Sequence, residues 1–129
     1  MNVAVEGKAY PEVPFLVDAD RVRAFRVVFG ERRDVVPPTF LTVAEFTVFP
    51  SIVSDPDVAL DFTRVVHGEQ EYELRRPLVV GEALVLRPRI ASARTKGGHG
   101  FLTIETEVRD AWGELVAVCR ASMIEREGS

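Results

Sequence analysis

The stretch from Phe40 to Phe49 constrains the fold more than any other part of the chain. Read as a helix, it points apolar side chains in every direction around its axis, and only two threonines and Glu45 are polar. A helix that is apolar on nearly all sides belongs inside a protein. Pro50 is expected to end this helix at about Val48 or Phe49. A chain of 129 residues must therefore wrap other elements around it.

Composition indicates a single globular domain spanning residues 1–129. Apolar residues make up 47% of the chain and charged residues 28%, and no run approaches the roughly 18 apolar residues of a membrane span. The start, MNVAVEGKAY, has no basic region followed by an apolar one, so we expect no signal peptide. Cys119 is the only cysteine, which excludes an internal disulfide and favours the cytoplasm. The net charge is −4 with scattered basic residues, which argues against nucleic acid as a partner.

One further helix is predicted near the N-terminus, from Ala19 to Phe29. Asp18 is a suitable N-cap residue, and Gly30 is a natural C-terminal stop. Val22, Phe25 and Phe29 recur at helical spacing and form one apolar face.

The second half of the chain is predicted to form four strands, listed here by their expected bounds: near Asp61 to the turn at 77–82, Ala83 to about Arg94, Phe101 to Arg109, and Glu114 to about Arg126. Asp110 to Gly113 reads as a tight hairpin connection. The segment from Met1 to Val5 is expected to add a short edge strand. The predicted fold class is α+β, with a curved antiparallel meander wrapped around the buried helix.

The first of these strands contains the sequence VVHGEQEYELRRPL, with His67 and Glu69 in its middle. Alternation places His67 on the outer face together with Glu69, Glu71 and Glu73. Gly68 is a candidate β-bulge, which would exchange the faces locally. A hairpin to the next strand would set Glu71 and Glu73 beside two arginines, Arg87 and Arg89, as a cross-strand charge ladder.

The pair His67 and Glu69 is the only constellation on this strand that resembles an acid–base site. A histidine becomes a catalytic base when a carboxylate orients it in a cleft. The spacing allows that arrangement, but it equally suits a structural or interface histidine beside a solvated row of carboxylates. We therefore take His67 and Glu69 as weak catalytic candidates.

The helices and strands together resemble the MaoC-like dehydratase family, in its N-terminal, FAS1-like dehydratase form. The most specific part of the resemblance is the block formed by His67–Gln70, Arg76–Leu78 and Gly81. The resemblance implies the hotdog fold, in which a curved antiparallel sheet surrounds a central helix. It also implies (R)-specific enoyl-CoA hydratase or (R)-3-hydroxyacyl-ACP dehydratase chemistry on an acyl thioester in fatty acid metabolism, without a metal or cofactor.

The family performs this chemistry with an Asp and a His in a G-D-x-N-P-x-H pattern after the first helix. In this chain the matching stretch, from Gly30 to Pro38, has Glu31 at the place of the Asp and no histidine. The resemblance therefore implies no catalytic residue. It implies a non-catalytic hotdog subunit that shapes the acyl tunnel for a catalytic partner. The residues expected to contact the acyl chain are Phe40, Ala44, Val66, Gln70 and Tyr72.

Other functions stay open at this stage. A homo-oligomeric hotdog thioesterase needs a carboxylate near the central helix, for which Glu45 is the one candidate. A binding protein for acyl thioesters without any chemistry is a further possibility, because a fold does not define a function. A homomeric hydratase would have to use His67 or His99, the only histidines. In each case the exposed strand edge predicts a dimer with itself or with another hotdog chain.

Overall fold

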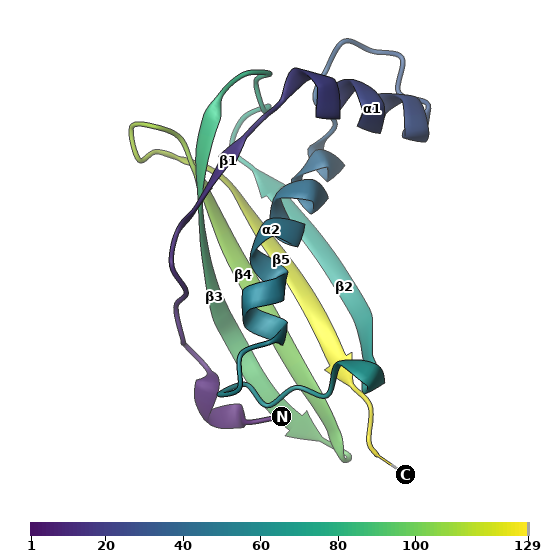
Figure 1. Cartoon of the computed structure of the whole chain (residues 1–129), viewed down its shortest axis with the longest axis vertical. Coiled ribbons are helices and arrows are strands. Elements are labelled where there is room, and N and C mark those ends of the chain that lie inside the picture. The colour runs from purple at the N-terminus through teal and green to yellow at the C-terminus, as the bar shows by residue number, and fades with distance from the viewer. Residues whose placement is uncertain (129) are drawn as a thin grey trace.

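A five-stranded antiparallel sheet curves around the central helix α2, and α1 lies across one end of it (Figure 1). The computed structural model describes residues 1–128. The helices are α1 (Ala19–Phe29) and α2 (Leu41–Val53), with short 3₁₀ turns at Val3–Val5, Pro38–Phe40 and Phe62–Arg64. The strands are β1 (Val13–Leu16), β2 (Val65–Leu74), β3 (Ala83–Lys96), β4 (His99–Arg109) and β5 (Leu115–Glu125). This is the predicted curved sheet around a helix.

The first helix forms as its local signals predict. The Asp18 carboxylate accepts a hydrogen bond from the Arg21 amide at 3.0 Å, which satisfies one of the free amides of the first turn. Gly30 ends the helix in the left-handed conformation, at a φ of +67°. The hairpin between β4 and β5 is also confirmed, since Gly113 adopts a φ of +82° and its amide bonds to the Asp110 carbonyl.

The central helix is longer than predicted. It continues through Pro50 to Val53, so the expected stop at Val48 or Phe49 is wrong. Proline already has a helical φ, and at this position it removes only the hydrogen bond that its amide would have donated one turn back. The last turn is held by the Ser54 amide and hydroxyl, which both bond to the Pro50 carbonyl.

The central helix is buried on most of its circumference but not on all of it. Its inner residues, including Leu41, Val48 and Ile52, are fully buried against the sheet. Phe46, however, is 65% exposed. The sheet therefore covers the helix incompletely, and one apolar side of α2 stays open.

The strand order differs from the predicted meander. The order is β1-β3-β4-β5-β2, so β2 pairs with β5 and lies at a sheet edge, with β5 and β4 between it and β3. The connection between β2 and β3 does not close as a hairpin, because it is held by the chain before α1. The Gly81 amide bonds to the Val17 carbonyl at 2.7 Å, and the Val17 amide bonds to the Glu82 carbonyl at 3.0 Å. The segment Met1–Val5 forms no strand but contains the 3₁₀ turn Val3–Val5, and the edge strand on that side is β1.

A charge row does cross the outer face of the sheet, but its partners are not the predicted ones. Arg120 on β5 stands opposite Glu71 on β2 and Glu105 on β4, and Glu105 stands opposite Arg89 on β3. The ion pairs of Arg120 with Glu105 and of Arg89 with Glu105 measure 3.0 and 2.9 Å. Arg120 also pairs with Glu73 at 3.2 Å. The expected pairing of Glu71 and Glu73 with Arg87 and Arg89 is wrong, because β5 and β4 lie between those strands.

We expect the replacement Arg120→Ala to lower the free energy of unfolding by roughly 1 kcal/mol, because it removes three ion pairs from one network. Arg87→Ala is the matched control. It breaks one exposed pair with Glu12 and should cost only about 0.5 kcal/mol or less. Urea unfolding at low and high salt measures both variants. Equal losses for the two variants, or a loss for Arg120→Ala that high salt leaves unchanged, would contradict this account.

Candidate functional site

A β-bulge at Gly68 turns His67 toward the central helix. The register of β2 against β5 shifts between His67 and Glu69, so that His67 stands opposite the buried Met123 while Glu69 stands opposite Ser122. The bulge was recognised as possible in the sequence, and the structure shows that it reverses the faces before it. The assignment of His67 to the outer, acidic face is therefore wrong. The His67 ring is fixed by its own strand, since Nε2 lies 3.0 Å from the Glu69 carbonyl and must donate to it.

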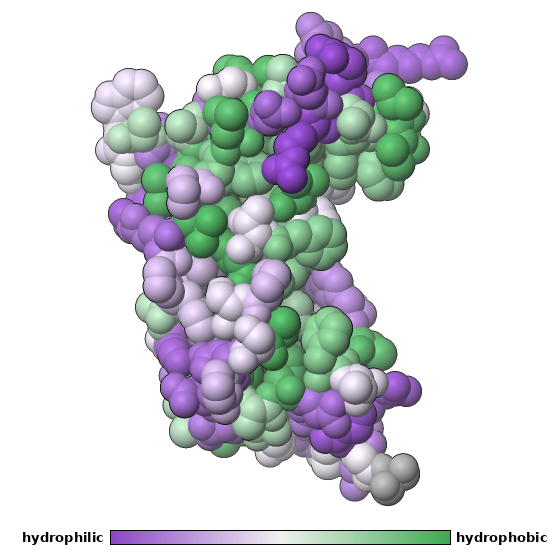
Figure 2. Space-filling view, viewed as in Figure 1, coloured by the Kyte–Doolittle hydropathy of each residue, from purple (hydrophilic) through white to green (hydrophobic). Residues whose placement is uncertain are grey.

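An apolar groove of about 430 Å³ lies between α2 and the first residues of β2. Figure 2 shows hydrophobic side chains gathered over this part of the molecule. The lining residues are Phe46, Phe49, Pro50, Val53, Phe62, Val65, His67 and Met123. His67 is the one polar side chain among them. A groove of this size and composition suits an apolar ligand.

Next to the groove, a polar cluster of Glu45, Gln70 and Tyr72 joins α2 to β2. Glu45 is only 1% exposed, and its carboxylate accepts hydrogen bonds from Gln70 Nε2 at 3.0 Å and from the Tyr72 hydroxyl at 2.9 Å. The Tyr72 hydroxyl also makes a short contact with the Thr42 hydroxyl. Burial raises the pKa of Glu45 above its ordinary value, although both hydrogen bonds act in the opposite direction. The cluster joins the central helix to the edge strand.

The raised pKa of Glu45 predicts a pH-dependent stability that Glu45→Gln removes. A carboxyl group whose pKa is higher in the folded state binds more protons when folded, so its contribution to stability falls as the pH rises above 4.5, the ordinary pKa of the group. The quantity to measure is the free energy of unfolding of the variant minus that of the original chain, between pH 4.5 and 7. We expect this difference to shift in favour of the variant as the pH rises. A difference that is flat over this range would contradict the raised pKa.

The segment Gly30–Pro38, where the family carries its Asp–His pair, contains an ion pair between Glu31 and Arg33 instead. Both Glu31 carboxylate oxygens accept from the Arg33 guanidinium, each at 2.9 Å, and one of them also accepts from the Arg33 amide. The Arg33 side chain and amide together lower the pKa of Glu31 to about 2. A carboxylate that is held ionised and whose oxygens are occupied is a poor general base.

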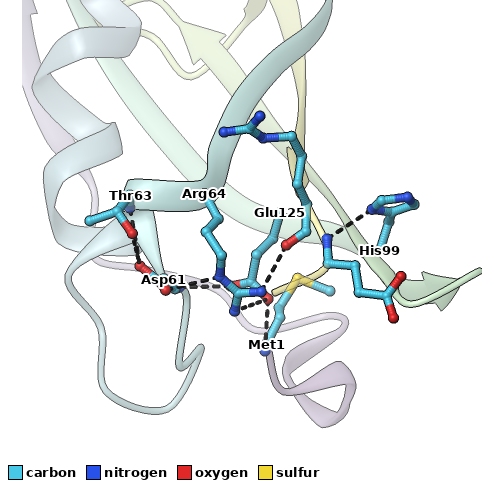
Figure 3. A network of polar contacts seen from close by, with 8 residues as sticks. Met1, Asp61, Thr63, Arg64, His99 and Glu125 are labelled. Atoms are coloured by element: carbon cyan, nitrogen blue, oxygen red, sulfur yellow. Dashed lines mark hydrogen bonds and ion pairs between the residues drawn. The ribbon is translucent and has the colours of Figure 1, made fainter. Parts of the chain in front are cut away.

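The other histidine, His99, begins β4 at the same end of the sheet as His67, with β5 between the two strands. Figure 3 shows His99 beside a network around Glu125, whose Oε2 accepts from the Asp61 amide at 2.7 Å. Arg64 bridges Asp61 and the carbonyl of Arg126 in the same network. His99 Nδ1 accepts from the Glu127 amide at 2.9 Å. The contacts around Glu125 fasten the end of β5 to the connection between α2 and β2, and His99 holds the residues that follow β5.

Within residues 1–128, no group of three or more His, Cys, Asp and Glu side chains could hold a metal ion.

The residues predicted to contact an acyl chain are dispersed in the structure. Phe40 and Ala44 are buried in the core, and Val66 is exposed on the face opposite to His67. Gln70 and Tyr72 face α2, where they donate hydrogen bonds to Glu45. Their role in substrate binding stays a prediction. The groove could not be predicted from the sequence, because a helix that is apolar all round does not indicate which of its sides stays open.

None of the helices in residues 1–128 is long and apolar enough to cross a membrane.

Comparison with known proteins gives a family match over most of the chain. Residues 28–119 match the model of a family described as FAS1-like, dehydratase domain region. A UPF0336 protein of Leifsonia xyli subsp. xyli is 31% identical, and the match covers 98% of this chain and 96% of the relative.

The solved structures that resemble this chain include two complexes and one longer chain. The truncated HadBC (3R-hydroxyacyl-ACP dehydratase) complex of Mycobacterium tuberculosis matches with a TM-score of 0.77 at 20% identity, over 93% of this chain and 96% of that chain. A MaoC-like dehydratase matches with a TM-score of 0.81 at 20% identity, over 97% of this chain and 43% of the other. The ChsH1–ChsH2 complex of Mycobacterium tuberculosis matches with a TM-score of 0.73 at 14% identity, over 94% and 85% of the two chains. At these identities the likeness establishes the fold, which is the predicted hotdog.

Proposed function

Because this chain belongs to the FAS1-like dehydratase domain region family, we propose that it is the non-catalytic hotdog subunit of an (R)-specific enoyl-CoA hydratase or (R)-3-hydroxyacyl-ACP dehydratase. In this role it binds part of the acyl chain, while a partner hotdog supplies the Asp–His pair. The observation that carries the proposal is the segment Gly30–Pro38. It has no histidine, and the carboxylate at the position of the Asp, Glu31, is neutralised by Arg33. The other carboxylate of the segment, Asp34, pairs with Arg26 at 3.4 Å.

The groove beside α2 supports a role in binding the acyl tail. Its walls are contributed by Phe46 and Phe49 of the helix and by Val65 of the strand, and it opens to solvent. An acyl tail gains about 25 cal/mol for each Å² of apolar surface that it removes from water there. Phe40 and Ala44, which the family resemblance also implies, lie in the core, and their contact with an acyl chain stays a prediction.

The edge strand β2 supports pairing with a second hotdog. Strand β2 is hydrogen-bonded to β5 on one side only, so its other side presents unpaired amides and carbonyls. Phe46 and Phe62, which are 65% and 64% exposed, stand beside this edge. An exposed strand edge next to exposed aromatic side chains is suited to an interface with another sheet. Two of the structural neighbours are complexes of two named components, HadBC and ChsH1–ChsH2, which is consistent with such pairing.

The decisive experiment is reconstitution of activity. Hydration of a trans-2-enoyl-CoA is measured for this chain alone and for this chain mixed with a hotdog chain that carries the Asp–His motif. The proposal requires turnover in the mixture and none above background for the chain alone.

A thioesterase based on Glu45 is the second candidate, and the geometry disfavours it. The Glu45 carboxylate is 1% exposed and both of its oxygens already accept hydrogen bonds from Gln70 and Tyr72. A nucleophile or base must reach the thioester carbonyl, and this carboxylate of α2 is covered by Gln70 and Tyr72 of β2.

We expect His67→Ala to leave the turnover of the reconstituted complex within about tenfold, or roughly 1.4 kcal/mol of activation free energy. His67 lies in the apolar groove, and one of its ring nitrogens is already engaged by the Glu69 carbonyl. Steady-state kinetics of the purified complex measures the effect, with size-exclusion chromatography to establish that the variant still assembles. A thousandfold loss in an assembled complex would make His67 a catalytic base.

A further inference from the structure

A second cavity, at the other end of the molecule from the N- and C-termini, has a different character from the acyl groove. It measures about 620 Å³ and lies between α1, the segment 34–36 and the connection between β2 and β3. Figure 1 shows that α1 and this connection lie at the same end of the sheet. One side of the cavity carries two arginines, Arg23 and Arg26, and its other walls are apolar, with Val22, Val36 and Leu78 among them.

Arg26 is the most unusual of the lining residues, because its guanidinium is mostly buried and weakly paired. The side chain is 22% exposed. Its nearest carboxylate, Asp34, is fully solvent-exposed and lies 3.4 Å away. One terminal nitrogen donates to the Arg32 carbonyl at 3.2 Å. Within residues 1–128, the buried Nε has no hydrogen-bond partner. The Nε is closed off from solvent, so a ligand in the cavity would meet the rest of the guanidinium, whose two terminal nitrogens make only long contacts.

The charges around the cavity favour an anion. Arg23 and Arg26 contribute two positive charges and Asp34 one negative charge to its lining. Arg23 is held by Asp20 on the same helix, at 3.1 Å, but both side chains are well exposed, and such pairs are weak. A planar guanidinium whose two Nη groups are both loosely held matches the two oxygens of an oxyanion.

We propose that this cavity binds an oxyanion attached to an apolar body, with the oxyanion on Arg26 and the apolar body against Val22, Val36 and Leu78. Arg23 adds long-range attraction at the rim. The oxyanion is a carboxylate or a phosphate monoester, since both present two oxygens to a guanidinium fork. The site is separate from the acyl groove between α2 and β2, and it stands whether or not the chain is the subunit of a hydratase.

The test is calorimetric titration of the full chain with matched probe pairs. Hexanoate and 1-hexanol differ only in the head group, as do 4′-phosphopantetheine and pantetheine. We expect hexanoate or phosphopantetheine to bind with a Kd below about 1 mM, and its uncharged counterpart about tenfold or more weakly. The probe that binds more tightly identifies the source of the oxyanion. Equal affinity for the charged and uncharged probes, or no binding of either anion up to about 20 mM, would overturn the proposal.

Variants on α1 locate the bound anion. Arg26→Gln is expected to weaken binding about tenfold or more, and Arg23→Gln severalfold, because Arg23 lies at the rim. Arg26→Lys keeps the charge but not the fork, so it should weaken binding as well. Arg21→Gln is the matched control, with the same charge change on the same helix but outside this cavity. Arg26 also donates to the Arg32 carbonyl, so the thermal stability of each variant is measured to separate a loss of binding from a loss of folding. Arg23 does not make that contact, so the weaker binding expected for Arg23→Gln tests the site independently of it. An equal loss of affinity in Arg21→Gln would mean a general charge effect and would refute the site.

Discussion

The purified chain alone is expected to hydrate a trans-2-enoyl-CoA no faster than background, and a mixture with a motif-bearing hotdog partner at least about a thousandfold faster. Positioned acid–base groups contribute typically 10²–10⁴-fold to such a reaction, and the segment Gly30–Pro38 offers none. The absorbance of the enoyl thioester follows the reaction directly. The partner is first assayed by itself, so that any gain on mixing can be assigned to the complex.

Two controls make this outcome specific. Glu31→Gln removes the one carboxylate that stands near the place of the family's Asp, and it should leave the activity of the complex unchanged, because Arg33 already neutralises that carboxylate. Replacing the motif histidine of the partner should abolish the activity of the complex. Substantial turnover by the isolated chain would disprove the non-catalytic role, and it would direct attention back to His67 and Glu45.

The second large effect concerns association. Phe46→Glu and Phe62→Glu are each expected to weaken pairing of the chain, with itself or with its partner, by about a hundredfold or more, which corresponds to about 2.7 kcal/mol. Each change places a charge in an apolar surface that pairing would bury. Both side chains are largely exposed in the single chain, so its own stability should change little.

Sedimentation equilibrium measures this effect on the dissociation constant. Val27→Glu is the matched control, since Val27 is even more exposed but lies on α1, away from the edge strand. If Val27→Glu weakens association as much as Phe46→Glu does, the interface does not lie at the β2 edge. If the unaltered chain is monomeric at micromolar concentration, and does not bind a motif-bearing hotdog, the pairing proposal is wrong.

The parts of the fold that depend on neighbouring residues could be predicted from the sequence. The bounds of α1 follow from the cap at Asp18 and the glycine at Gly30, which act within one turn of the chain. The tight β4–β5 hairpin follows in the same way from Gly113. The family resemblance added what local signals do not contain, namely the enclosure of the central helix by the sheet.

The partner of β2 could not be predicted, because long-range pairing has no local signal. Glu71 and Glu73 complement Arg87 and Arg89 as well as they complement Arg120, so the charges alone allow either strand to be the neighbour. The short connection to β3 favoured a hairpin, but contacts with Val17 hold that connection elsewhere. Only the register of β2 against β5 distinguishes the two arrangements.

The candidate site was predictable in its parts but not in its assembly. The sequence identifies Glu45 as the one carboxylate of the central helix, and the family resemblance singles out Gln70 and Tyr72. Their union into one hydrogen-bonded cluster depends on where β2 lies along α2, which the sequence does not specify. The single extra residue at the Gly68 bulge similarly decided the direction of His67.

The position of β2 at the edge beside β5 also determines when this strand can join the sheet. β3, β4 and β5 follow one another through short turns, so they can pair as soon as they are made. β2 must wait for a strand that is synthesised last, since Gln70 and Arg120 lie 50 residues apart. Throughout that delay its strand-forming backbone has no partner within the chain. Completion of the sheet therefore waits for β5, and β2 is the last strand to be paired within the chain.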